Sequence, residues 1–126
     1  HSGEWTDDPA NPSRAWGTAA AEGLHPVHSS YWRSWHFTRE EVLFFQFAPD
    51  PNVKAGFIQG NRLVPADATA ALASGFCRTR PSWFAPKPLH SYAAWAPTSA
   101  SPGEPSRIIL LEDRETGSLF FYGCQM

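Results

Sequence analysis

The stretch that decides the fold runs from Arg107 to Cys124 and reads Arg107-Ile-Ile-Leu-Leu-Glu112, Asp113-Arg-Glu-Thr-Gly117, Ser118-Leu-Phe-Phe-Tyr-Gly-Cys124. Both apolar runs are rich in residues that favour strands. The loop between them is short and contains Gly117, which tolerates a positive φ angle. Two such runs joined by a Gly-containing loop predict a β-hairpin. We expect this hairpin to form the centre of a sheet.

Further strands are expected upstream. Residues 28–37 alternate with period two, and residues 42–48 are rich in residues that favour strands, so we expect these segments to form a second hairpin. Residues 54–59 are predicted as a short third strand, because prolines break the chain before them and Gly60 follows. Residues 90–95 are predicted as another short strand.

Two helices are expected. Pro65 suits a first helical position and Gly75 suits a C-terminal stop, so the main helix is predicted over residues 65–75. A short N-terminal helix is predicted from Ser13, as its cap, to Ala21. Local hairpins with few helices indicate an α+β fold with a mainly antiparallel sheet of about five to six strands.

The length of 126 residues favours one domain. Residues 1–13 are polar and rich in proline, so we expect a flexible leader or tether there and the α+β domain over residues 14–126. The net charge of −2 gives no electrostatic reason to expect a nucleic-acid partner. No apolar run approaches the roughly 20 residues that cross a bilayer, so no membrane span is expected.

The chain has two cysteines, Cys77 and Cys124. Such a pair is compatible with one disulfide in an oxidising compartment, or with two buried thiols in a cytosolic protein. We favour the disulfide. The chain also begins without Met on a polar stretch, which suits a mature form after removal of a signal peptide. We therefore expect a periplasmic or secreted protein.

Three predicted strands carry apolar residues on both faces: residues 42–47, 108–111 and 119–122. A half-exposed antiparallel strand would alternate instead, so both faces of the sheet need cover. One slim helix at residues 65–75 can cover only part of one face. The remaining cover comes from the chain's own loops, from closure into a barrel, or from another protein.

Candidate chemistry is weak. His25 and His28 have a spacing compatible with metal binding, but no carboxylate or cysteine completes a zinc pattern. Either cysteine could be a nucleophile beside His36 or His90, but no local signature surrounds them. No metal or other cofactor is expected, and catalysis is not expected.

The candidate binding residues are aromatic and cationic, because arginine and tryptophan are enriched at interface hot spots. Trp83 and Phe84 are adjacent large aromatics in a proline-rich loop, and basic residues flank them. The full set of candidate binding residues is Trp83, Phe84, Arg78, Arg80, Trp32 and Trp35.

The sequence thus favours a small, non-catalytic domain that binds another protein, as an inhibitor, an immunity-type factor or an assembly adaptor does. The alternative is a small enzyme or ligand carrier with a pocket between the sheet and loop 78–90. A cavity lined by His36, His90 or a carboxylate would favour that alternative.

Overall fold

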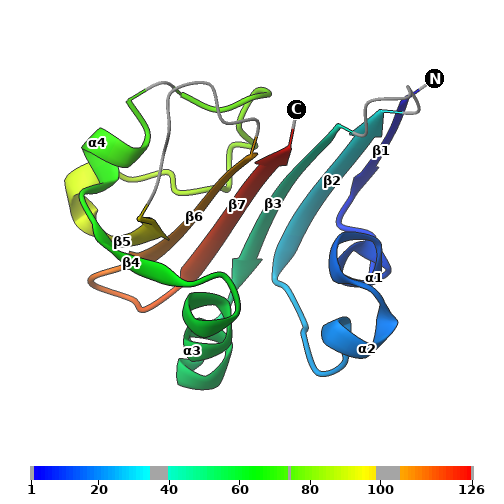
Figure 1. The fold of residues 1–126 in the computed structure, drawn as a ribbon, viewed down its shortest axis with the longest axis horizontal. Coiled ribbons are helices and arrows are strands. Elements are labelled where there is room, and N and C mark those ends of the chain that lie inside the picture. The colour runs from blue at the N-terminus through cyan, green and yellow to red at the C-terminus, as the bar shows by residue number, and fades with distance from the viewer. Residues whose placement is uncertain (1, 35–39, 74, 99–105, 126) are drawn as a thin grey trace.

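The C-terminal hairpin is confirmed, and it lies at the centre of one antiparallel sheet. The computed structural model describes residues 2–34, 40–73, 75–98 and 106–125. In these ranges the sheet has seven strands in the order β1-β2-β3-β7-β6-β5-β4 (Figure 1). The strands are β1 (Ser2–Thr6), β2 (His28–Ser34), β3 (Glu41–Phe47), β4 (Leu63–Ala66), β5 (Tyr92–Pro97), β6 (Ser106–Asp113) and β7 (Leu119–Gln125). The helices are α1 (Asn11–Trp16), α2 (Thr18–Ala21), α3 (Pro51–Gly60) and α4 (Ala68–Ala71), with a 3₁₀ turn η1 (Leu89–Ser91).

The turn between β6 and β7 forms as the sequence predicts. Gly117 has a φ angle of +80°, which a residue with a side chain adopts only under strain. The Asp113 carboxylate accepts hydrogen bonds from the backbone amides of Glu115 and Thr116, at 2.8 and 3.2 Å. This local bonding fixes the turn and, through it, the pairing of β6 with β7.

The general α+β class is confirmed, but the described part of the sheet has seven strands where about five to six were expected, and two predicted elements are wrong. The segment expected as a third strand, residues 54–59, lies in helix α3. Asp50 caps this helix by accepting hydrogen bonds from the amides of Asn52 and Val53, and Pro51 occupies its first turn. The proline and aspartate that we expected to break a strand are in fact a helix start signal.

The predicted main helix over residues 65–75 is also wrong in extent. Pro65 lies in strand β4, opposite Trp95 of β5, and only four residues after Asp67 form α4. Because β4 is at the sheet edge, the missing amide of Pro65 costs no ladder hydrogen bond. Asp67 caps α4 through the amide of Ala70.

The N-terminal region forms a strand and two short helices. Residues 2–6 form β1 and pair with β2, and the N-terminal helix begins at Asn11 and breaks at Gly17 into α1 and α2. Asn11 is fully buried, and its side-chain amide donates hydrogen bonds to the Trp5 carbonyl and the Ser29 hydroxyl. The segment expected as a tether therefore contributes an edge strand and part of a helix.

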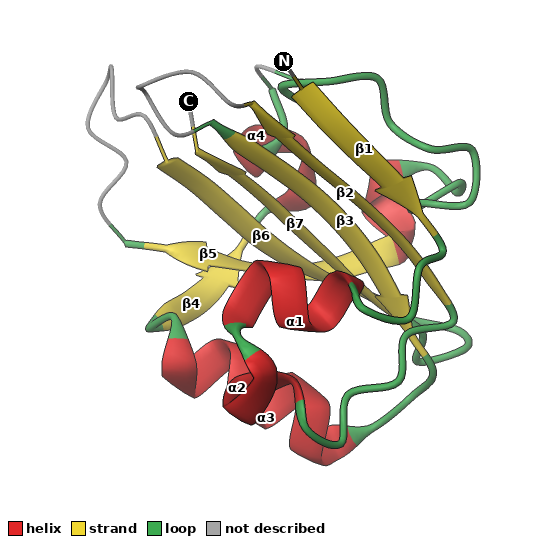
Figure 2. Ribbon diagram, turned by 90° about the vertical axis from the view of Figure 1, so that its right-hand side faces the viewer, coloured by secondary structure: helices red, strands yellow, loops and turns green. Residues whose placement is uncertain are grey.

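The chain itself covers both faces of the sheet. We call residues 76–91 the cover segment. The face of the sheet under α1, α2 and α3 is the helical face, and the face under α4 and the cover segment is the loop face (Figure 2). Successive strand residues alternate between them: Phe44 packs on the loop face and Phe45 on the helical face. Within the described ranges, the exposed large apolar side chains are Val27 and Val64. The chain's own segments thus supply the cover that the apolar strands require.

The predicted disulfide is confirmed. Cys77 at the start of the cover segment is bonded to Cys124 of β7. This bond joins the cover segment to the central strand. Nearby, the Tyr122 hydroxyl accepts a hydrogen bond from the Cys77 amide. None of the helices in the described ranges has the length and apolar content to cross a lipid bilayer.

Candidate functional site

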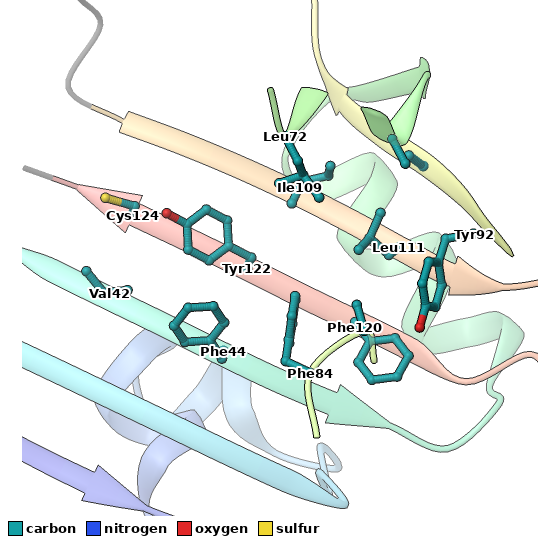
Figure 3. Close-up of a cluster of buried hydrophobic side chains, with 13 residues drawn as sticks. Val42, Phe44, Leu72, Phe84, Tyr92, Ile109, Leu111, Phe120, Tyr122 and Cys124 are labelled. Carbon is teal, nitrogen blue, oxygen red and sulfur yellow. The ribbon is translucent and has the colours of Figure 1, made fainter. Parts of the chain in front are cut away.

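The candidate binding residues separate into core and surface groups. Phe84 has no exposed surface, and its ring packs edge-on against Phe44 and Phe120 at 5.1 and 5.4 Å (Figure 3). Phe84 thus fills the space between the sheet and the cover segment, where a pocket was the alternative expectation. It is a core residue in this structure.

Arg80 is exposed, but its guanidinium turns back onto its own segment. Its guanidinium donates hydrogen bonds to the backbone carbonyls of Phe84 and Ala85, both at 2.6 Å. Ala85 has a positive φ angle of 43°, which is unusual for a residue with a side chain. Arg80 therefore satisfies two carbonyls of a tight turn and fixes the part of the cover segment that carries Phe84.

Arg78 and Trp32 come together at the surface. The Arg78 guanidinium lies over the Trp32 ring, 4.5 Å from its centroid, and is 3.3 Å from the Glu4 carboxylate. Trp32 is half-buried against the loop-face core. Three elements, β1, β2 and the cover segment, thus supply one acidic, one aromatic and one cationic side chain at one place.

Trp83 lies in the same region of the loop face. Its ring stacks on the imidazole of His28 with 5.1 Å between the centroids, and the ring is half-buried. His28 Nδ1 is 3.3 Å from the Asp7 carboxylate. We call the set of Glu4, His28, Trp32, Arg78 and Trp83 the β1–β2 strip.

The β1–β2 strip adjoins an open sheet edge. Among the described residues, β1 pairs with β2 alone, so its other side is the edge of the sheet. The Asp7 amide donates to the Ser29 carbonyl, so residues 7 and 29 form a hydrogen-bonded pair. Because such pairs alternate along an antiparallel ladder, the amides of Glu4 and Thr6 point away from β2. The opposite edge strand, β4, contains Pro65 and lacks one such donor.

Two hollows lie near the cover segment. One, of about 680 Å³, lies at its start and is lined by Glu4 and residues 76–80. The other, of about 470 Å³, is lined by Asp67, His90, Tyr92 and Arg114, among others. Burial is the main cause that raises the pKa of the Tyr92 hydroxyl, which accepts a hydrogen bond from the Lys87 amide. Both hollows are open to solvent at the rim of the loop face.

Two residues expected at a site from the sequence, Trp35 and His36, lie outside the described residues. Within the described ranges, no three side chains of histidine, cysteine, aspartate or glutamate gather where they could hold a metal ion. Sequence reasoning missed the pairing of His28 with Trp83 and of Trp32 with Arg78, because each joins residues more than 40 positions apart with no local signal.

Comparison with known proteins does not identify this site. No family model matches the chain, and no curated protein and no solved structure is significantly similar to it.

Proposed function

We propose that this chain is a non-catalytic domain that binds another protein through the β1–β2 strip and the open edge of β1. The observation that carries the proposal is the arrangement of Trp32 under Arg78 beside this edge. Arginine and tryptophan are the residue types most enriched at interface hot spots. An open edge strand offers main-chain groups to an extended segment of a partner.

The contacts within the strip support this proposal because they fix the side chains before binding. Arg78 is held between Glu4 and Trp32, and Trp83 is held by His28. Side chains that are already ordered lose less conformational entropy when a partner arrives. The strip therefore has both the composition and the order of a binding surface.

The disulfide supports a periplasmic or secreted location for this function. Disulfides persist in oxidising compartments and are rare in the cytosol. The Cys77–Cys124 bond also anchors the start of the cover segment, one residue before Arg78. In this proposal the partner is a protein of the same compartment, and the domain acts as an inhibitor, an immunity-type factor or an adaptor.

The test uses the protein as bait in extracts of its source, with matched variants. Thr6→Pro removes an amide that points away from β2, so it blocks strand addition while leaving the β1–β2 ladder in place. Thr6→Val is its control. Trp83→Ala and Arg78→Ala test the strip, and Val64→Ala on the far edge is their control. We expect one protein to be retained by wild type and both controls and to be lost with the three test variants.

Retention of the same protein by Thr6→Pro and Trp83→Ala, with thermal stability close to wild type, contradicts the proposal. Thermal unfolding of every bait shows that a lost partner reflects the surface and not an unfolded protein. The partner, once found, is then measured directly by calorimetry with each purified variant.

The rival proposal is a small enzyme or ligand carrier that uses the hollow beside His90. An imidazole, a carboxylate and a guanidinium line this hollow, and such groups can act as acid, base and anion clamp. A screen of hydrolase substrates and metabolites with wild type and His90→Ala separates the two proposals. Turnover or binding that depends on His90 favours the rival, and its absence with partner capture intact favours the protein-binding domain.

A further inference from the structure

A second candidate surface lies on the helical face, on the opposite side of the sheet from the cover segment. A hollow of about 690 Å³ lies between the α1–α2 region and α3, and a smaller one of about 130 Å³ lies farther along the sheet. Trp16 and Asn61 line both hollows. The two hollows are therefore neighbours on the helical face, and we call them together the groove, with residues of the α1–α2 region on one side of the larger hollow and residues of α3 on the other.

Glycines keep this groove open. Gly56 and Gly60 are four residues apart on α3, which places them on the same side of the helix, and both line the groove. A Cβ atom at either position would have no neighbour within 4 Å. On the floor, Leu43 packs closely over Gly123 of β7, where a Cβ atom would lie 3.2 Å from the Leu43 side chain. A larger residue at Gly56 or Gly60 would therefore fill the groove from its α3 wall.

The lining is apolar and aromatic. The Trp16 ring packs against Phe45 at 4.7 Å and Phe57 at 5.5 Å, and it is half-buried. Leu24 and Val53 line the larger hollow and are also half-buried. Apolar side chains of a ligand that entered the groove would therefore lose water against Trp16, Leu24 and Val53.

The charged side chains of the larger hollow are carboxylates. Glu22 and Asp50 line it from opposite sides, and among the described residues no lysine, arginine or histidine does so. In the smaller hollow, Glu41 accepts a hydrogen bond from the Tyr31 hydroxyl at 2.6 Å, and Arg33 stands opposite Glu41 on β2. Arg107 also lines this smaller hollow, so the complement to a basic group is assigned to Glu22 and Asp50 of the larger one.

We infer that the groove binds a segment of a partner polypeptide that carries lysine or arginine next to apolar side chains. The carboxylates complement the basic group, and Trp16, Leu24 and Val53 complement the apolar ones. An extended segment fits better than a small molecule, because small-molecule sites enclose most of their ligand and this groove is open along its length. This site is separate from the β1–β2 strip, so either proposal can fail without the other.

The probe is a short fluorescein-labelled peptide that alternates lysine and leucine, and the matched probe has glutamate in place of lysine. Fluorescence anisotropy measures the affinity of the full chain for each. We expect saturable binding of the lysine peptide that weakens as salt is added, and no binding of the glutamate peptide. Equal binding of both peptides, or no saturable binding of the lysine peptide, overturns the inference.

Two variants with matched controls place the binding in the groove. Gly56→Leu fills the groove at an exposed helical position, and Ala70→Leu adds the same side chain on α4, on the loop face. Asp50→Asn removes a charge but keeps a good helix cap, and Asp67→Asn makes the same change at the cap of α4. We expect Gly56→Leu to weaken binding about tenfold or more, Asp50→Asn to weaken it severalfold, and both controls to match wild type.

Wild-type affinity of Gly56→Leu overturns the inference, and so does equal weakening by Asp67→Asn and Asp50→Asn. The thermal unfolding midpoint of each variant shows whether weaker binding results from misfolding. Gly56→Leu replaces a poor helix former in α3 and is expected to leave the midpoint unchanged or raised.

Discussion

Replacement of Phe84 by alanine tests whether the cover segment is part of the core. The Phe84 ring has no exposed surface and lies within 5.9 Å of the ring centroids of Phe44, Phe76 and Phe120. Removing a fully buried phenylalanine ring costs about 3–5 kcal/mol, since the lost burial and the new cavity add. For a domain of this size we expect the unfolding midpoint to fall by about 10–20 °C.

The adjacent Trp83→Ala variant is the matched comparison. Trp83 is half-buried and loses chiefly its stacking on His28 and part of its burial, which we expect to cost about 1–2 kcal/mol. Phe84→Leu keeps most of the buried volume and should cost less than Phe84→Ala. Urea denaturation followed by circular dichroism, with the disulfide intact, gives the free energy of unfolding for all three variants.

The outcome separates two roles for adjacent aromatic residues. If Phe84→Ala lowers the free energy of unfolding by no more than Trp83→Ala does, the cover segment does not pack on the sheet as described. A large loss for Trp83→Ala would instead move Trp83 into the core and remove it from the proposed binding surface.

Three further predictions concern the disulfide, Asn11 and Asp113. Reduction of the Cys77–Cys124 bond, whose cysteines are 47 positions apart, should lower the free energy of unfolding by about 4 kcal/mol in the chain-entropy model; urea curves with and without reductant measure it, and coincident curves contradict it. Asn11→Ala should cost about 1–3 kcal/mol, because it leaves the buried Ser29 hydroxyl without this donor; a thermal midpoint equal to wild type would refute that anchoring role. The pKa of Asp113 is lowered to about 2, chiefly by the Lys87 ammonium, which lies 2.8 Å from the carboxylate, and further by hydrogen bonds from backbone amides. The resulting stabilisation is present above about pH 4 and is lost as pH falls through about 2, so the stability difference between wild type and Asp113→Asn should shrink over that range; a pH-independent difference in acid denaturation contradicts the assignment.

Much of the sheet could be predicted from sequence because its signals are local. The β6–β7 hairpin has its apolar runs, its turn aspartate and its glycine within one short stretch, and the structure uses each of them. The pair of cysteines likewise had one way to bond within the chain. The alternation in residues 28–34 was enough to predict β2.

The same local reasoning was wrong where two readings of one signal compete. Pro49-Asp50-Pro51 can end a strand or start a helix, and here Asp50 caps α3. Pro65 can begin a helix or lie in an edge strand, and its position at the sheet edge decided for the strand. In both cases the neighbouring strand or the packing surface determined the result.

The sequence by itself determined that the chain has a hairpin-based antiparallel sheet whose strands need cover on both faces, because strand periodicity and turn chemistry act over a few residues. Only the tertiary structure decided what provides that cover and which surfaces remain. Phe84 entered the core while Trp83 stayed at the surface, and the groove beside Trp16 opened between α1–α2 and α3. These outcomes depend on contacts between residues far apart in the chain, and packing of one segment against another leaves no local pattern.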